Sequence, residues 1–381
     1  MSLYLDYNAS APILKDSADA VIDCLKNVGN PSSVHRSGRK VKAIIENSRQ
    51  KIASMIGISS NNIIFTSGAT EANFLAMNAS NNMRAILSSI EHPSVLSQRN
   101  DALLIPVDKS GVVSLDQLEK ILYNNQSEQM FISVMLVNNE TGVIQPIEEI
   151  IRISKKYNTI IHVDAVQAIG RIPINMNESF EESKIDFMTI SSHKIGGPKG
   201  VGCLIYKKNS EHLLLPYIKG GGQEHGKRAG TEAVELIAGF GVAADYSSNF
   251  YINESKKSRD LLEELCLKSC PNALIIGYNA PRVSNTSSIA FEGVEAENMV
   301  IALDLAGYEV SSGSACSSGK VSPSHVLRAM GYPDSVLNSS IRISLCSYLE
   351  EDIIKKFVEK ISKIVVNLES IKESINASCI S

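Results

Sequence analysis

The chain has 381 residues, of which 44% are hydrophobic and 20% are charged, and its formal net charge at pH 7 is −4. This composition is typical of a folded protein with a large core and excludes a disordered chain, while the slight negative charge gives no basic surface for nucleic acid. No apolar run approaches the roughly 20 residues that a membrane-spanning helix needs, and MSLYLDYN at the N-terminus lacks the pattern of a secretory signal. We therefore expect a cytoplasmic protein that binds neither membrane nor nucleic acid.

The cysteines do not indicate a disulfide framework, because there are seven of them at irregular spacing. Cys266 and Cys270 are one helical turn apart in LEELCLKSCP, which favours one face of a helix over a metal site. The histidines are scattered as well, so we expect no metal centre.

Short apolar runs alternate with helical patterns between about residue 40 and residue 245. The runs predicted as strands are 63–66, 85–89, 103–107, 130–137, 160–164, 187–191 and 202–206. Several are continuous Ile/Val/Leu runs, as in strands that are buried on both faces of a parallel sheet. Helical patterns such as 71–79 and 146–157 separate several of them, which predicts an α/β fold with helices on both faces of the sheet.

The C-terminal part of the chain repeats this alternation on a smaller scale. Segment 226–246 predicts a loop that leads into a long helix. Further strands are predicted at 284–291, 308–312 and 341–345, with a helix around 299–307. An amphipathic helix closes the chain, and its apolar stripe consists of Ile354, Phe357, Val358, Ile361, Val365 and Leu368. We expect a large domain over about 13–250 and a smaller domain formed by 1–12 together with 251–381.

The residues that follow the predicted strands form the candidate site, because open parallel sheets bind ligands beyond the carboxyl ends of their strands. In FTSGATEANFLAM, backbone N–H groups at the helix start near Ala69 and the Thr70 hydroxyl can bind a phosphate, although plain turn chemistry explains the pattern equally well. Asp164 ends another buried strand, where it needs a partner such as a protonated heteroaromatic nitrogen or serves as the cap of the next helix.

Two further strand ends carry reactive side chains. His193 and Lys194 precede a Gly-Gly-Pro turn, where a lysine in a pocket can act as an amine nucleophile and a surface lysine is the alternative. Asn138, Asn139 and Glu140 follow a fourth strand, where an ordinary Asn turn is the alternative. Together, the phosphate-type turn, the aspartate and the lysine match what pyridoxal phosphate (PLP) needs: an anion cradle, an acid for the ring nitrogen and an amine for a Schiff base.

Many motifs stand in the order in which one enzyme family has them: YLDYNASAP, GNPSSVH, FTSGATEANFLA, EHPSV, VNNETGVIQPI, HVDAVQAIG, SSHKIGGPKGVGCLIY, GGGQEHGKRAGT, SSGSACSSG, SPSHVLRAMG and IRISL. With them, residues 3 to about 345 resemble cysteine desulfurases of the NifS/IscS type, PLP enzymes of the class V aminotransferase superfamily. SSHK and SSGSAC are the most specific of these motifs. The resemblance implies the PLP-dependent transferase fold type I, with a mostly parallel seven-stranded sheet between helices in a large domain and a smaller α+β domain.

The resemblance also implies how PLP is held. Lys194 would form the Schiff base, Asp164 would pair with the ring nitrogen, and Gln167 would hydrogen-bond the phenolic oxygen. His92 would stack on the ring, and its alternative is a strand-end histidine with a backbone partner. The cofactor-binding set is Ala69, Thr70, Asn139, Asp164, Gln167, Ser191, His193, Lys194 and Thr231. Within it, Thr70, Ser191 and His193 would bind the phosphate, whereas Thr231 would reach the phosphate of the other subunit in a homodimer.

The implied reaction converts L-cysteine to L-alanine. Arg342 would bind the substrate carboxylate with its guanidinium fork, and Asn139 would contact the substrate. Lys194 would move the α-proton and His92 would assist at the substrate thiol. The thiolate of Cys316 would attack the substrate sulfur and become a persulfide, which then passes to an acceptor such as an iron–sulfur scaffold protein or a carrier for tRNA thiolation.

Serine and glycine surround Cys316 in the segment 311–322, and this composition predicts a mobile loop. The alternatives in function are a selenocysteine lyase, another aminotransferase-like PLP enzyme, and a non-catalytic binding partner. Two places depart from the family pattern: Asn-Ala-Ser follows Tyr7 where relatives carry Ala-Thr-Thr, and Cys346 with Ser347 follows IRISL. We expect Cys346 to be a packed small side chain.

Overall fold

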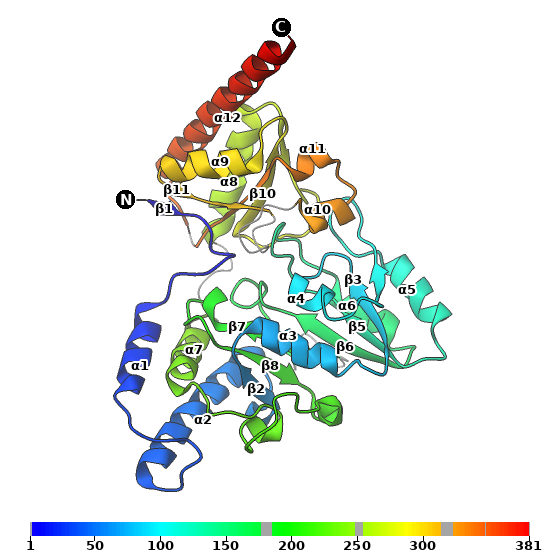
Figure 1. The fold of residues 1–381 in the computed structure, drawn as a ribbon, viewed down its shortest axis with the longest axis vertical. Coiled ribbons are helices and arrows are strands. Elements are labelled where there is room, and N and C mark those ends of the chain that lie inside the picture. The colour runs from blue at the N-terminus through cyan, green and yellow to red at the C-terminus, as the bar shows by residue number, and fades with distance from the viewer. Residues whose placement is uncertain (1, 177–184, 248–253, 314–322, 347, 381) are drawn as a thin grey trace.

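The computed structural model describes residues 2–176, 185–247, 254–313, 323–346 and 348–380. Cys316 lies outside the described residues, as does most of the segment 311–322 that was predicted to be a mobile loop. A seven-stranded sheet forms the lower part of the view in Figure 1, and a four-stranded sheet lies in the upper part beneath the C-terminal helix.

The large sheet confirms the predicted α/β fold. Its strands, in spatial order, are β2 (Ile63–Thr66), β8 (Gly202–Tyr206), β7 (Ile185–Ser191), β6 (Thr159–Asp164), β5 (Met130–Ser133), β3 (Arg84–Ser88) and β4 (Leu103–Ile105). All neighbouring strands are parallel except that β8 runs antiparallel to both β2 and β7. The sheet is therefore mostly parallel.

Strand β5 is shorter than the predicted strand at 130–137. It ends at Ser133, although the chain remains extended enough for the N–H groups of Val134 and Leu136 to donate to the carbonyls of His162 and Asp164. The prediction was too long because these residues are as apolar and as buried as the strand itself. Periodicity cannot mark a strand end inside a continuous apolar run.

Helices cover both faces of this sheet (Figure 1). They are α1 (Lys15–Leu25), α2 (Arg36–Ile56), α3 (Ala69–Asn78), α4 (Pro93–Leu96), α5 (Leu115–Asn124), α6 (Ile147–Ser154) and α7 (Val234–Ser247). The side chains of β2 show the two layers: Ile63 and Phe65 pack in one layer with α2 and α7, whereas Ile64 packs in the other with α3. Each large apolar side chain buried in this way contributes about 2 kcal/mol, which explains the near-continuous apolar strands.

The smaller sheet is antiparallel, in the order β12 (Ser311–Ser312), β13 (Ser340–Ser344), β10 (Thr286–Phe291) and β9 (Ala273–Ile275). Its helices are α8 (Glu254–Ser269), α9 (Ala296–Leu305), α10 (His325–Ala329), α11 (Asp334–Leu337) and α12 (Glu351–Ile380). The predicted apolar stripe of α12 packs here, with Phe357 and Ile361 buried against Cys266 of α8 and Met299 of α9 in one core.

The N-terminal residues lie beside this smaller sheet. Strand β1 (Leu3–Tyr4) pairs in parallel with β11 (Tyr308–Glu309), and Asp6 forms an isolated bridge with Ser344. The chain then crosses toward the large sheet and enters α1 (Figure 1). The division into domains 13–250 and 1–12 with 251–381 stays a prediction.

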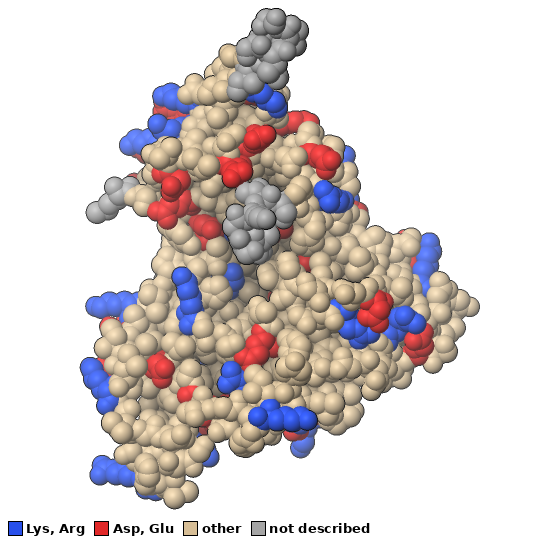
Figure 2. Space-filling model, viewed as in Figure 1, with Lys and Arg blue, Asp and Glu red and all other residues tan. Residues whose placement is uncertain are grey.

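Charged side chains of both signs are interspersed on the face that Figure 2 shows. Exposed ion pairs such as Lys26–Asp23, at 2.7 Å, add little to stability because water and salt screen them. Within the part of the chain that the structure describes, no helix is both long enough and apolar enough to span a bilayer.

Candidate active site

A cavity of about 510 Å³ opens beside the carboxyl ends of β6 and β7. The predicted site residues that line it are Ala69, Thr70, His92, Asn139, Asp164, Gln167, Ser191, His193, Lys194 and Arg342. Thr231 is not among its lining residues, and Cys316 lies outside the described residues. The fold thus brings most of the predicted site into one cleft.

An anion-binding turn lies at one end of the cleft, between β2 and α3. The first backbone N–H groups of a helix have no partner within it, so those at Ala69 and Thr70 are available to a ligand. A side chain on Gly202, in the neighbouring strand, would place its Cβ 2.9 Å from the carbonyl carbon of Gly68. Glycine is therefore required there for strand and turn to pack this closely.

Glu71 stabilises the same turn. Its Oε2 accepts a hydrogen bond from the Ser67 N–H at 2.7 Å, and its Oε1 accepts one from Arg228 Nε at 2.8 Å. Burial opposes ionisation, but the hydrogen bonds from Arg228 and Ser67 outweigh it and lower the pKa of Glu71. Glu71 is thus an ionised clamp behind the anion site rather than a ligand for an anion.

His193 and Ser191 add polar groups to this end of the cleft. Strand β7 ends at Ser191, and a single helical turn, Ser192–Lys194, follows it. Burial and the nearby charges of Lys194 and Lys199 lower the pKa of His193 to about 4. Its imidazole is therefore neutral at pH 7 and can give one N–H to an anion.

Lys194 is half-buried and lines the cleft, which favours the pocket lysine over the surface lysine. Its Nζ donates to the carbonyl oxygens of Asn8 at 2.7 Å and Ala9 at 2.9 Å. These carbonyls come from the N-terminal segment and hold the amine in place.

Asp164, at the end of β6, provides a carboxyl group in the lining of the cleft. Its Oδ1 accepts from the Val166 N–H at 3.0 Å, and its Oδ2 accepts from Asn73 Nδ2 at 2.8 Å. Residues 166–171 form turns and not a helix, so the predicted role as a helix cap is wrong. Burial, and next the charge of Asp164, raise the pKa of the fully buried Glu91 well above its usual range. Glu91 is not among the residues that line the cleft, so the carboxyl group that faces the cleft is that of Asp164.

His92 has the backbone partner that its sequence allowed, and its stacking on PLP stays a prediction. It precedes α4, and its Nδ1 accepts a hydrogen bond from the Ser94 N–H at 3.1 Å, which is the expected backbone partner. The ring also lines the cleft. Burial lowers the pKa of His92; Asp164 opposes this effect, and Lys194 and His325 add to it.

Asn8 is a site residue that sequence reasoning left open. Its carbonyl accepts from Lys194 and also from Gln167 Nε2, at 2.9 Å. Its buried side chain donates to Thr286 Oγ1 at 3.0 Å and to the Asn139 carbonyl at 3.2 Å. Asn8 thus contacts β10 and three residues that line the cleft, so the N-terminal segment is well anchored although Asn-Ala-Ser departs from the family pattern.

Arg342, on β13, faces the cleft from the smaller sheet. Its Nη2 donates to Asp6 Oδ1 at 2.7 Å and its Nη1 donates to the Asn139 carbonyl at 3.1 Å. Its Nε is buried and has no hydrogen-bond partner among the described residues. These two contacts orient the guanidinium and use two of its five N–H groups.

Asn138 and Asn139 have different roles: Asn138 forms the turn, and Asn139 lines the cleft. Asn138 Oδ1 accepts from the N–H groups of Glu140 and Thr141, both at 3.0 Å, which is the ordinary Asn turn. Asn139, held by that turn, lines the cleft.

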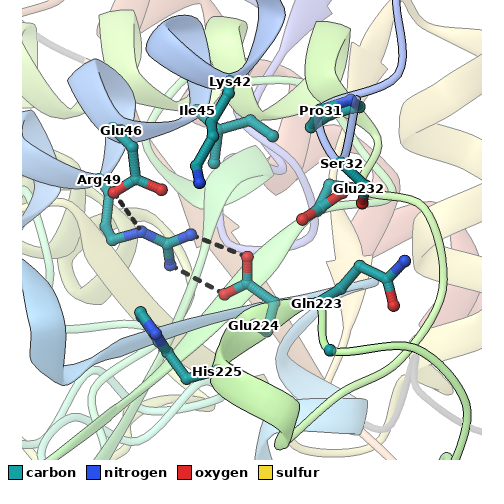
Figure 3. Close-up of a pocket in the computed structure, with 11 residues that line it drawn as sticks. Pro31, Ser32, Lys42, Ile45, Glu46, Arg49, Gln223, Glu224, His225 and Glu232 are labelled. Atoms are coloured by element: carbon teal, nitrogen blue, oxygen red, sulfur yellow. Dashed lines mark hydrogen bonds and ion pairs between the residues drawn. The ribbon is translucent and has the colours of Figure 1, made fainter. Parts of the chain in front are cut away.

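Thr231 is exposed, and its GGGQEHGKRAGT motif forms a second cavity of about 380 Å³ against α2 (Figure 3). There Arg49 forms a buried two-pronged ion pair with Glu224, with both N–O distances 2.8 Å. Glu224 and His225 adopt left-handed backbone conformations with φ of 46° and 56°, which cost of order 1–3 kcal/mol each. The ion pair holds this strained turn in place while Thr231 remains at the surface.

The donor set of the cleft fits PLP. A helix start with hydroxyl groups suits a phosphate, a carboxylate suits a protonated pyridine nitrogen, and an amine between them suits a Schiff base. Two further lining residues, Asn73 and Ser94, were missed because no sequence pattern links them to the site.

Comparison with known proteins gives a consistent picture. Residues 3–357 match the family model described as Aminotransferase class-V. The chain is 38% identical to a cysteine desulfurase of Nostoc sp. (strain PCC 7120), over 97% of this chain and 94% of that protein. It is also 38% identical to the cysteine desulfurase IscS of Dictyoglomus turgidum, over 97% of this chain and 96% of that protein. Its fold is similar to that of the NifS-like protein from Rickettsia africae ESF-5, with a TM-score of 0.86, 38% identity and coverage of 96% of this chain and 99% of that one.

Proposed function

Because this chain belongs to the aminotransferase class-V family and is a PLP-dependent cysteine desulfurase, we propose that the cleft described above converts L-cysteine to L-alanine and that Cys316 takes up the sulfur. The observation that carries this assignment is the joint presence of the Lys194 amine, the Asp164 carboxylate and the anion-binding turn in one cavity.

When bound, PLP supplies an electron-withdrawing ring that stabilises negative charge at the α-carbon of the substrate. Asp164 would hold the proton on the ring nitrogen, and Gln167 would donate toward the phenolic oxygen. Lys194, whose amine is held by the carbonyls of Asn8 and Ala9, would bind the cofactor and move the α-proton of L-cysteine. The N–H groups at the start of α3, Thr70, Ser191 and neutral His193 would hold the phosphate.

Arg342 binds the carboxylate of L-cysteine in this proposal. Its place in the lining of the cleft and the N–H groups that its contacts to Asp6 and Asn139 leave unused support that role. Asp6 and the Asn139 carbonyl pre-orient the guanidinium, so little side-chain entropy is lost when the substrate binds.

Cys316, as a thiolate, forms a bond to the substrate sulfur. The Cβ–S bond of the substrate breaks, its electron pair stays with the carbon skeleton, and protonation of that carbon gives alanine while Cys316 keeps the sulfur as a persulfide. The described residues on either side support this assignment: Ser324 Oγ donates to Glu140 Oε2 at 2.5 Å, and a Cβ on Gly313 would lie 3.3 Å from the same oxygen. Both therefore flank Glu140, which follows the cleft residue Asn139.

A homodimer completes the proposal. Thr231 is exposed and lies outside the cleft of its own chain, so its hydroxyl is available to the phosphate site of a second copy. Light scattering at micromolar concentration should report the mass of two chains, and a stable monomer would contradict this part. A cytoplasmic location and a sulfur acceptor such as an iron–sulfur scaffold or a tRNA-thiolation carrier stay predictions from the sequence.

The deciding experiment follows alanine formation and protein-bound sulfur in purified PLP-loaded protein given L-cysteine. Cys316→Ala should bind the cofactor normally and lose most alanine formation. Cys346→Ala removes a half-buried described cysteine and is the control, expected to keep activity. Equal turnover in the Cys316→Ala variant would contradict the persulfide assignment, and wild-type protein that makes no alanine would contradict the proposed function.

A further inference from the structure

A continuous chain of hydrogen bonds connects His92 to Asp164. Asn73 Nδ2 lies 2.8 Å from Asp164 Oδ2 and 2.9 Å from Ser94 Oγ. Ser94 Oγ lies 2.7 Å from His92 Nδ1, and the Ser94 N–H donates to the same nitrogen at 3.1 Å. Asn73 and Ser94 are both buried, and the contacts of this chain join α3, the start of α4 and the end of β6.

The direction of each hydrogen bond in this chain is fixed by chemistry. A carboxylate only accepts, so the Asn73 amide must turn its NH₂ group toward Asp164. The second hydrogen of that NH₂ group then goes to Ser94 Oγ, which acts as an acceptor. Ser94 has one hydroxyl hydrogen, and His92 Nδ1 is the acceptor within its reach.

The protonation of His92 follows. Nδ1 receives the Ser94 hydroxyl and also the Ser94 backbone N–H, which can only donate, so Nδ1 carries no hydrogen itself. Since burial lowers the pKa of this ring, His92 is neutral and its single hydrogen sits on Nε2. The charged or titratable groups around the ring are Asp164, Lys194 and His325.

We propose that Ser94 and Asn73 are positioning residues that fix His92 in the Nε2–H form, so that it holds the sulfur of L-cysteine as a hydrogen-bonded thiolate. This inference rests on the proposed function and narrows the role of His92. A neutral ring with its hydrogen on Nε2 gives a hydrogen bond from that atom and cannot take a proton there. The proton of the substrate thiol must therefore go to water, and His92 stabilises the thiolate that remains.

The test measures the protonation of His92 directly, by ¹⁵N NMR of PLP-loaded protein labelled in its histidines. Comparison with a His92→Gln sample identifies the signals. Wild-type protein should show a protonated Nε2 and a bare Nδ1 near neutral pH. Ser94→Ala should raise the fraction of rings with Nδ1 protonated severalfold, because one of two donors to Nδ1 is lost. Ser94→Thr, which keeps the hydroxyl, should restore the wild-type signals.

Ser89→Ala is the matched control, since Ser89 lies in the same segment and its hydroxyl has no hydrogen-bond partner among the described residues. For L-cysteine, Ser94→Ala should lower kcat about tenfold, the effect of one hydrogen bond, and leave the PLP dissociation constant unchanged. Unchanged His92 signals in Ser94→Ala, or equal losses in Ser89→Ala and Ser94→Thr, would overturn the inference. The NMR readout needs no turnover, so failure of the desulfurase assignment remains a separate result.

Discussion

The cleft wall built by the seven-stranded sheet and the wall built by the smaller sheet use charge in different ways. On the first wall, burial lowers the pKa of His92 and of His193 and so keeps both rings neutral beside Asp164 and Lys194. On the second wall, the charge of Arg342 is already paired, at 2.7 Å from Asp6.

We interpret this difference as a division of roles, in which the first wall serves the reaction and the second wall recognises the substrate. Neutral groups can give or receive protons and hydrogen bonds without breaking an ion pair, which suits the wall that holds the cofactor. A paired, pre-oriented guanidinium suits recognition of a carboxylate whose charge does not change during the reaction. The following substitutions test this contrast, beginning with the largest expected effect.

Lys194→Ala removes the amine of the first wall. We expect alanine formation to fall at least about a thousandfold and the absorbance of the lysine-bound cofactor to disappear, because no other group replaces a lost nucleophile efficiently. Lys199→Ala, a second lysine that lines the cleft, should keep that absorbance. If Lys199→Ala lost this absorbance and Lys194→Ala kept it, Lys194 would not be the residue that attaches the cofactor.

Glu140→Gln changes a buried residue between the two walls, where Glu140 accepts a hydrogen bond from Ser324. Burial raises the pKa of Glu140 to about 7, although Ser324 and Arg342 oppose this effect. The folded chain thus keeps a proton that the unfolded chain releases near its ordinary value of 4.5. The contribution of this group to the free energy of unfolding is complete below that value and is lost as pH rises through about 7, a change of roughly 3 kcal/mol.

Urea unfolding at about pH 5 and about pH 8 measures this loss. Between about pH 5 and about pH 8, the free energy of unfolding of the wild-type protein should fall by roughly 3 kcal/mol more than that of the Glu140→Gln variant. Glu128→Gln, at an exposed glutamate, should behave as wild type. Identical pH dependence in wild type and Glu140→Gln would show that Glu140 ionises normally.

Arg342→Lys weakens the second wall and leaves its charge in place. We expect KM for L-cysteine to rise about tenfold with a smaller change in kcat, because an ammonium group cannot form the two-pronged contact. Steady-state kinetics measure this change, and Arg328→Lys, at an exposed arginine, is the control. A fall in kcat at constant KM would assign Arg342 to the chemistry instead.

Thr231→Val has the smallest expected effect. In the proposed dimer it removes one hydrogen bond to the phosphate, so the PLP dissociation constant should rise by less than about tenfold. Thr231→Ser keeps the hydroxyl and should match wild type. An unchanged dissociation constant in Thr231→Val would argue against a contact across the dimer.

The sequence predicts the strands of the large sheet well, because strands buried on both faces need continuous apolar runs. Ile63–Thr66 and Gly202–Tyr206 lie where the pattern places them. The antiparallel direction of β8 was not predictable, since the apolar pattern of a strand is the same in both directions. The end of β5 was missed for a related reason, because buried apolar residues continue beyond it.

The candidate site was predictable where a motif fixes a strand end, as at Asp164 and Lys194. It was not predictable where the contact depends on the tertiary fold. Asn73 meets Asp164, 91 positions away, and Arg342 meets Asp6, 336 positions away. Side chains that act through another residue, as Ser94 does, leave no pattern of their own.

The early position of the N-terminal segment in the chain has a consequence for the order of assembly. Strand β1 pairs with Tyr308–Glu309, Asp6 pairs with Ser344, and Asn8 hydrogen-bonds Thr286. Residues 3–8 are synthesised long before these partners and must wait for them, and such distant contacts form slowly. The carbonyls that hold the Lys194 amine come from this segment, so the large sheet can be complete before the cleft is ready for its cofactor.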